Sequence, residues 1–273
     1  MAITRIIIAG AAGRMGRALI REALATPGVA LAGGFERAGH DAIGADLGPL
    51  AGLDALGMAV ESKPPQTRAD ALIDFTAPAA SLEAARAAAA AGTPLVIGTT
   101  GFSVAEEAEI AELASRVAIV KSGNMSLGVN LLAALVKEAA TRLGPDYDIE
   151  IIEAHHRAKT DAPSGTALML GEAAAQGRGL NLATVAVKSR TGVVGPRPDN
   201  AIGFAVVRGG GIVGDHEVIF AGAQEVISLS HRAIDRGLFA KGAIAAARWV
   251  KGKPPGLYSM QDVISGAGSG EAG

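Results

Sequence analysis

The sequence contains no cysteine among its 273 residues. Disulfide bonds, thiolate-ligated zinc sites and a cysteine nucleophile are therefore excluded. It also lacks an excess of charge of one sign, because 25 lysines and arginines face 27 aspartates and glutamates, for a net charge of -2. This balance favours neither nucleic acid nor an anionic membrane as a partner. Any bound anion must therefore be recognised by a local cluster of basic groups.

Long hydrophobic runs are also missing. The alanine-rich stretch 84–91 is interrupted by Arg86 and bounded by Gly92 and Pro94, so it is too short to span a membrane. The apolar run near the N-terminus is short, has no cleavage-site pattern and leads directly into glycines, as a first strand would. With 49% hydrophobic and 19% charged residues, the composition is that of a globular protein. We expect a soluble, cytoplasmic protein.

Strand and helix patterns alternate through the first half of the chain. Thr4–Ala9 is a continuous β-branched run, Arg17–Ala25 has helical spacing and Val29–Phe35 forms a second strand pattern. Further strands are expected at Ala69–Asp74, Pro94–Ile97 and Val117–Val120, and helices at Ala79–Ala91 and Val104–Ser115. This α/β alternation predicts an N-terminal Rossmann-like domain with a doubly wound parallel sheet.

The first strand is followed by Gly10, Gly13 and Gly16, and the second strand by Glu36 and Arg37. Glycines there allow a tight turn, which lets backbone N–H groups at a helix N-terminus approach a pyrophosphate. An acidic residue about twenty positions further on can accept hydrogen bonds from the adenine ribose. The alternative is that the glycines only form a tight turn, but the full combination favours a dinucleotide site.

Glu36 favours the free 2′-hydroxyl of NADH, whereas the guanidinium of Arg37 can bind the 2′-phosphate of NADPH. Together they predict that NADH and NADPH are both used, although a solvated surface position for Arg37 explains that residue equally well. Three further loops, 75–78, 98–100 and 122–125, follow predicted strands. Ligands bind at the carboxyl ends of strands in such sheets, so these loops are expected at the same site.

The pattern changes after residue 126. Leu127–Leu143 is an amphipathic helix, followed by a helix at Ser164–Gly177 and strands at Asp148–Glu153, Thr184–Ser189, Gly203–Arg208, Glu217–Ala221 and Glu225–His231. This favours a second, α+β domain with an open mixed sheet, and Phe239–Trp249 is a final helix. We expect a dinucleotide-binding domain at 1–126, to which 239–264 returns, a substrate-binding and oligomerisation domain at 127–238, and a flexible tail at 265–273.

The segment from Glu153 to Ala167 concentrates titratable groups between a strand and a helix. His155, His156 and Lys159 are candidates for the general acid and for anion binding. The backbone N–H groups of Gly165 and Thr166, together with nearby hydroxyls, can receive a carboxylate at the helix N-terminus.

A metal site is the alternative for this segment. Adjacent histidines on a strand point to opposite faces, so His155 and His156 are not expected to share a metal. The other polar residue of the segment, Asp161, is expected to cap the helix that follows.

The segment E-A-H-H-R-A-K-T-D-A-P-S-G-T-A resembles the signature of the dihydrodipicolinate reductase family of lysine and diaminopimelate biosynthesis. GAAGRMG, DFTAP, VIGTTG and the GVN that follows Asn124 resemble elements of that family in the same order. The resemblance covers nearly the whole chain. It implies hydride transfer from NADH or NADPH to an unsaturated cyclic dicarboxylate, the reduction of 4-hydroxy-tetrahydrodipicolinate to tetrahydrodipicolinate, by a homotetramer.

The resemblance also implies residue roles. His155 and Lys159 would handle the proton, with their division of labour left open, and His156, Gly165 and Thr166 would contact the substrate. The cofactor residues implied are Gly10, Ala11, Ala12, Gly13, Arg14, Met15, Glu36, Arg37, Gly98, Thr99, Thr100, Ser122, Gly123, Asn124 and Met125.

Two positions depart from the family pattern. Ala77 stands where many members carry arginine, and 122–125 differ from the usual A-x-N-[FY]. Two other functions compete with this reductase: a related reductase or dehydrogenase acting on a semialdehyde or imine, and a cofactor-binding regulator without turnover.

Overall fold

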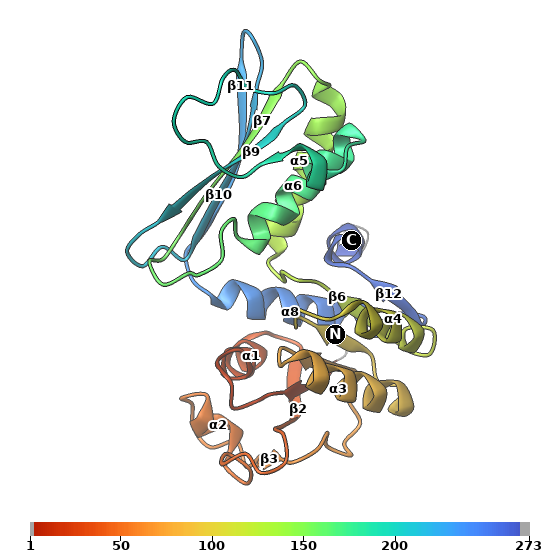
Figure 1. The fold of residues 1–273 in the computed structure, drawn as a ribbon. Coiled ribbons are helices and arrows are strands. Elements are labelled where there is room, and N and C mark those ends of the chain that lie inside the picture. Colours follow the sequence, from red (N-terminus) through yellow and green to blue (C-terminus); the bar gives the residue numbers. More distant parts are fainter. Residues whose placement is uncertain (1–2, 268–273) are drawn as a thin grey trace. The chain divides into compact units, whose positions relative to one another are not determined.

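The computed structural model describes residues 3–267 (Figure 1). The chain divides into two compact units, one of Met1–Leu127 with Gly237–Gly273 and the other of Gly128–Arg236. No helix of the described residues is long and apolar enough to cross a membrane.

The first unit is built on a seven-stranded sheet with the order β12-β6-β5-β4-β1-β2-β3, in which all neighbouring strands are parallel. The strands are β1 (Thr4–Ala9), β2 (Val29–Phe35), β3 (Val60–Glu61), β4 (Ala71–Asp74), β5 (Leu95–Ile97), β6 (Ala118–Lys121) and β12 (Gly256–Tyr258). The helices are α1 (Arg14–Ala25), α2 (Leu47–Leu50), α3 (Pro78–Ala91), α4 (Val104–Leu113), α8 (Gly237–Val250) and α9 (Met260–Ala267). The predicted parallel sheet is confirmed.

Both faces of this sheet are buried. Ile6 and Ile8 of β1 pack with α1 and α8, whereas Ile7 and Ala9 pack with α3 and α4 on the other face. Successive strand side chains point to opposite faces, so a strand covered on both sides is apolar throughout. This explains why the Ile6–Ala9 part of β1 lacks an alternating pattern.

Three sequence predictions in this unit are wrong in detail. Helix α1 begins at Arg14 rather than Arg17, because Gly10 completes the turn with φ of +64° and the chain is helical directly after Gly13. β12 and α9 were not predicted. The tail expected from residue 265 is helical in α9 as far as Ala267, and the remainder of that predicted tail lies outside the described residues.

The second unit contains a five-stranded mixed sheet with the order β11-β10-β7-β9-β8. Its strands are β7 (Asp148–His155), β8 (Ala186–Val187), β9 (Ile202–Arg208), β10 (Gly214–Ala221) and β11 (Val226–Ala233). β7 pairs in parallel with β9 and antiparallel with β10, so the predicted open mixed sheet is confirmed. The helices are α5 (Leu127–Leu143), α6 (Gly165–Arg178) and α7 (Leu182–Val185).

Helices α5 and α6 cover one face of this sheet through Val136, Ala140, Leu170 and Ala174 (Figure 1). The strand predicted at Thr184–Ser189 is mostly wrong. Asn181 accepts a hydrogen bond from the backbone N–H of Ala183 and starts the short helix α7, which leaves only Ala186–Val187 as a strand.

Candidate active site

Strand β7 presents its alternate side chains to the helix-covered face of the second sheet. Ile149, Ile151, Glu153 and His155 are all buried, and Glu153 and His155 are only 1% and 8% exposed. His156 follows the last strand residue and is half-buried. The strand therefore carries a carboxylate and an imidazole into the core, in the same register as the isoleucines.

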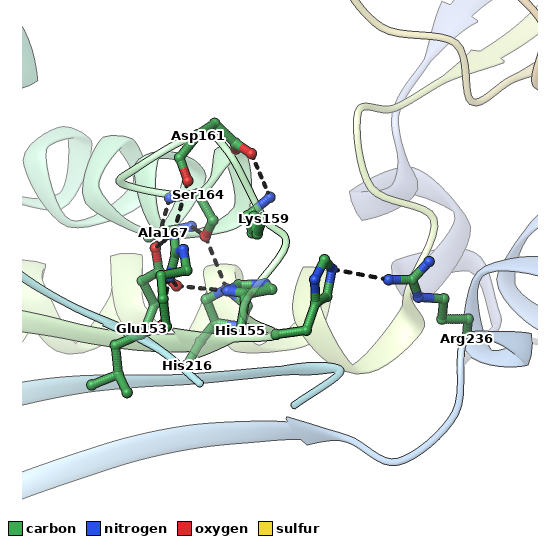
Figure 2. Close-up of polar contacts among 11 residues, drawn as sticks. Glu153, His155, Lys159, Asp161, Ser164, Ala167, His216 and Arg236 are labelled. Atoms are coloured by element: carbon green, nitrogen blue, oxygen red, sulfur yellow. Dashed lines mark hydrogen bonds and ion pairs between the residues drawn. The ribbon is translucent and has the colours of Figure 1, made fainter. Parts of the chain in front are cut away.

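The carboxylate of Glu153 is held by four hydrogen bonds, and Figure 2 shows those to His155 and Ser164. Oε2 contacts Nδ1 of His155 at 2.6 Å and accepts from Nη1 of Arg208 at 2.8 Å. Oε1 accepts from the backbone N–H of Ser164 at 2.9 Å and from Nη2 of Arg208 at 2.7 Å. Burial by itself raises the pKa of Glu153, but these hydrogen bonds together hold its pKa below the ordinary value. The group is therefore a carboxylate inside the core.

A second imidazole, His216 of β10, packs edge to face against His155 with ring centroids 5.0 Å apart. Its Nε2 lies 3.2 Å from the hydroxyl of Ser164. Burial, reinforced by the neighbouring His155, lowers the pKa of His216 to about 4. His216 is consequently neutral near neutral pH.

Lys159 lies in the turn between β7 and α6. Its ammonium group pairs with the carboxylate of Asp161 at 2.8 Å, and only 21% of its side chain is exposed. This hydrogen bond lowers the pKa of Asp161 against a small opposing effect of burial. The expected capping role of Asp161 is wrong, because Ser164 is the N-cap of α6 and its hydroxyl accepts from the N–H of Ala167.

The remaining predicted substrate residues lie in the same turn. His156 accepts a hydrogen bond at its Nε2 from Arg236, at 3.1 Å (Figure 2). Gly165 is exposed and begins α6, followed by Thr166. The start of a helix carries a partial positive charge and attracts an anion. The structure thus gathers His155, His156, Lys159, Gly165 and Thr166 around the β7–α6 connection.

In the first unit, the turn between β1 and α1 is shaped by close backbone approach. A Cβ on Gly16 would lie 2.1 Å from the carbonyl oxygen of Gly10, so only glycine fits there. The N-terminus of α1 has no side-chain cap, and Gly13 and Arg14 are exposed beside it, next to Ala11, Ala12 and Met15. An uncapped helix start after a glycine turn fits a cofactor pyrophosphate.

Glu36 lies at the end of β2 and is 9% exposed. Its Oε1 accepts from the backbone N–H of Ala12 at 3.0 Å, which ties the end of β2 to the glycine turn. Arg37 follows it and is exposed. One oxygen of Glu36 thus supports the turn.

The loops after β4 and β5 are joined by a buried cluster of hydroxyls around Asp74. Thr76 and Thr99 donate to its carboxylate at 2.6 and 3.0 Å, and Ser81 donates as well. Burial raises the pKa of Asp74, although these hydrogen bonds oppose the effect. The Thr99 side chain therefore points into this cluster, whereas Thr100 is exposed. Gly98 leaves room for the ring of Phe75.

The loop after β6 closes on itself. Ser122 donates to the carbonyl of Asn124 at 2.8 Å, and the side-chain oxygen of Asn124 accepts from the N–H of Ser126 at 2.9 Å. Gly123 is exposed, whereas the Met125 side chain is 1% exposed and belongs to the core. Of the predicted cofactor residues, Thr99 and Met125 can therefore contribute to a ligand site only through their backbone.

Sequence reasoning missed three polar residues of the β7–α6 site, which are Arg208, His216 and Arg236. It also missed that Glu153 is buried there. Glu153 could have been found, because the period of two that buries Ile149 and Ile151 continues to it. The other three lie more than fifty residues from His155 in the sequence, and no local pattern indicates that they contact this segment.

Two family models match the chain: "Dihydrodipicolinate reductase, N-terminus" over residues 4–125 and "Dihydrodipicolinate reductase, C-terminus" over residues 128–264. The 4-hydroxy-tetrahydrodipicolinate reductase of Parvibaculum lavamentivorans is 56% identical over 95% of this chain and 97% of its own length. That of Caulobacter vibrioides is 57% identical over 95% and 96%. Among solved structures, a dipicolinate-bound dihydrodipicolinate reductase from Paenisporosarcina sp. TG-14 shares the fold, with a TM-score of 0.73 at 23% identity over 94% of this chain and 97% of that chain.

Proposed function

The chain belongs to the dihydrodipicolinate reductase family, and we propose that it reduces 4-hydroxy-tetrahydrodipicolinate to tetrahydrodipicolinate in lysine and diaminopimelate biosynthesis. Relatives more than half identical over almost the whole chain carry that substrate in their names. The related reductase from Paenisporosarcina was solved with dipicolinate bound, and dipicolinate is a small cyclic dicarboxylate of the same kind. A cytoplasmic location remains part of this proposal.

The observation that carries the proposal is the buried Glu153–His155 pair next to Lys159 at the start of α6. Reduction adds a hydride to the substrate, and the negative charge that results must be quenched by an acid. His155 and Lys159 hold exchangeable protons at their ring and ammonium nitrogens. His156, supported by Arg236, and the N–H groups of Gly165 and Thr166 bind the carboxylates and orient the ring.

The fold and family imply a nicotinamide cofactor, which supplies the hydride when bound. The glycine turn Gly10–Met15 and the start of α1 would hold its pyrophosphate, and Glu36 its adenine ribose. Thr100 and Gly123 are exposed in the loops after β5 and β6, at the carboxyl ends of these strands, where the cofactor would lie. Because Arg37 is exposed beside Glu36, we propose that both NADH and NADPH are used.

A homotetramer assembled through the second sheet is also part of the proposal. The face of this sheet away from α5 and α6 leaves Val207 of β9 49% exposed, and Val226 of β11 is 63% exposed. Apolar strand residues of this kind are typical of an interface. Light scattering of the purified chain would measure the assembly, and a monomer would contradict it.

The test is a coupled assay that supplies the condensation product of pyruvate and aspartate semialdehyde with each reduced nicotinamide in turn. The wild-type chain is expected to oxidise the cofactor only when this product is present. His155→Gln and Lys159→Ala are each expected to lower kcat by roughly a hundredfold or more, with cofactor KM nearly unchanged. Lys188→Ala, at an exposed position of the same unit, is the control. Normal turnover in both site variants would refute the catalytic assignment.

A further inference from the structure

His155 has two ring nitrogens, and the structure treats them differently. Nδ1 is 2.6 Å from Oε2 of Glu153, inside the core. Nε2 lies on the opposite side of the ring, toward Gly214 at the start of β10. A neutral imidazole carries one proton, so its hydrogen-bond partners decide which nitrogen can exchange a proton with a ligand.

Both carboxylate oxygens of Glu153 are hydrogen-bonded. Arg208 donates a hydrogen bond to each of its oxygens, and the backbone N–H of Ser164 donates a further one. An ionised carboxylate can accept hydrogen bonds but cannot donate them, so the ring nitrogen that faces it must carry a proton. Since Arg208 balances the charge of Glu153, the pair can hold a neutral imidazole as well as a charged one. Nδ1 of His155 therefore carries a proton in the neutral ring as well as in the charged one.

His216 holds the other side of the ring. Its edge-to-face contact, with an angle of 73° between the rings, limits rotation of His155. The Ser164 hydroxyl, 3.2 Å from Nε2 of His216, anchors that second ring to the N-cap of α6. Because burial keeps His216 neutral above about pH 4, it adds no positive charge beside His155.

Gly214 leaves the space in front of Nε2 open. A Cβ at this position would lie 3.0 Å from Nε2 of His155 and 3.3 Å from its Cδ2. The backbone of Gly214 does not have a positive φ, so alanine is tolerated there apart from this contact. Because Gly214 has no side chain, it leaves space beside Nε2, the ring nitrogen of His155 that does not contact Glu153.

We propose that Glu153 and His216 are positioning residues that fix His155 as the Nδ1–H tautomer, so that Nε2, beside Gly214, is the atom that exchanges a proton with the substrate. The catalytic half of this statement rests on the proposed function. The tautomer and the position of the ring do not depend on it.

The first test measures the tautomer without any ligand. Long-range ¹H–¹⁵N spectra of ¹⁵N-histidine-labelled protein contain signals from only five histidines, and His155→Gln assigns those of His155. The neutral ring is expected as the Nδ1–H tautomer. In Glu153→Gln the amide oxygen is drawn to Ser164 and Arg208, the NH₂ faces Nδ1, and the tautomer is expected to switch to Nε2–H. An Nε2–H tautomer in the wild type, or no change in Glu153→Gln, would overturn the proposal.

The second test follows kcat. Gly214→Ala leaves Glu153 untouched and is expected to keep the Nδ1–H tautomer while lowering kcat on the order of a hundredfold. His216→Phe keeps a ring without nitrogens and is expected to lose less. Glu172→Gln, at an exposed position of α6, is the control.

The two tests separate the two proposals. If the tautomer is as expected but Gly214→Ala retains full activity, then Nε2 is not the exchanging atom and the catalytic half fails. If His155 is the Nε2–H tautomer, the positioning role of Glu153 fails. The proposed reductase function still stands in that case, provided that the wild type is active and His155→Gln is inactive.

Discussion

Arg208 donates two parallel hydrogen bonds to Glu153, at 2.8 and 2.7 Å, from a neighbouring strand of the second sheet. Removing one partner of such a buried pair leaves an uncompensated charge. Arg208→Met is therefore expected to lower the free energy of unfolding by about 3–5 kcal/mol, measured by urea denaturation.

Arg232 provides the matched control for this prediction, because it pairs with Asp215 at 3.0 Å while its own side chain is 79% exposed. Arg232→Met is expected to cost at most about 1 kcal/mol. The double variant Glu153→Gln/Arg208→Met should lose less than the sum of its single changes. Equal losses in Arg208→Met and Arg232→Met would contradict the buried-charge explanation.

His216 predicts a loss of stability in mild acid. Its pKa falls from 6.5 in the unfolded chain to about 4 in the folded protein, so the unfolded state binds more protons between these values. Stability is fully present above about pH 6.5 and declines as pH falls to about 4, by roughly 3 kcal/mol. In His216→Asn this part of the pH dependence is expected to disappear. Parallel stability curves for the two proteins over that range would show that the ring does not stay neutral.

Asp74 is expected to show the opposite sign. Its pKa is raised by burial, so its contribution is fully present below 3.8 and is lost as pH rises through the folded-state pKa. Asp74→Asn, which mimics the protonated acid, should therefore gain stability relative to the wild type as pH rises. For Asp70, burial is outweighed by hydrogen bonds from Arg5 and Lys251 that lower the pKa, so Asp70→Asn should lose relative stability with rising pH. The same direction in both variants would refute the assignment.

The glycine turn offers a steric prediction. A Cβ on Gly16 would overlap the carbonyl of Gly10 at 2.1 Å, whereas a Cβ on Gly13 would lie 3.2 Å from the same oxygen. Gly16→Ala is expected to cost about 1–3 kcal/mol and to weaken cofactor binding, with a much smaller loss of stability in Gly13→Ala. Thermal unfolding and cofactor titration measure the two effects. Equal losses would mean that the close approach of α1 to the turn is unimportant.

Arg37 tests the cofactor preference. Its exposed guanidinium is expected to contact only a 2′-phosphate, so Arg37→Ala should raise KM for NADPH about tenfold, or about 1.4 kcal/mol, and leave KM for NADH unchanged. A preference of the wild type for one cofactor by roughly a hundredfold, about 2.7 kcal/mol, would refute dual use.

The sequence predicted most strands because each one carries its own evidence. A parallel strand buried on both faces, such as β1, is a continuous apolar run, and β7 alternates because only one face of its sheet is covered. β12 is a strand of three residues after a Gly- and Pro-rich stretch, so its pairing with β6 supplies what its sequence does not show.

The candidate site was predictable where it is local. His155, His156 and Lys159 lie within five consecutive residues, and their motif names them. Arg208 reaches Glu153, and His216 reaches His155, only because β9 and β10 flank β7 in the sheet. The wrong assignment of Asp161 as the helix cap has a local origin, because Lys159 pairs with its carboxylate and Ser164 is closer to the helix start.

The first unit is discontinuous in sequence, and this determines when it can fold during synthesis. Its core includes Ile244 and Val250 of α8 and Val263 of α9, and β12 forms the edge strand next to β6. The ribosome delivers these residues only after the whole of Gly128–Arg236, a continuous segment with a core of its own, has been made. We therefore expect the second unit to fold first on the ribosome. The sheet of the first unit would wait, with the edge of β6 open to chaperones and to mispairing, until α8 and β12 emerge.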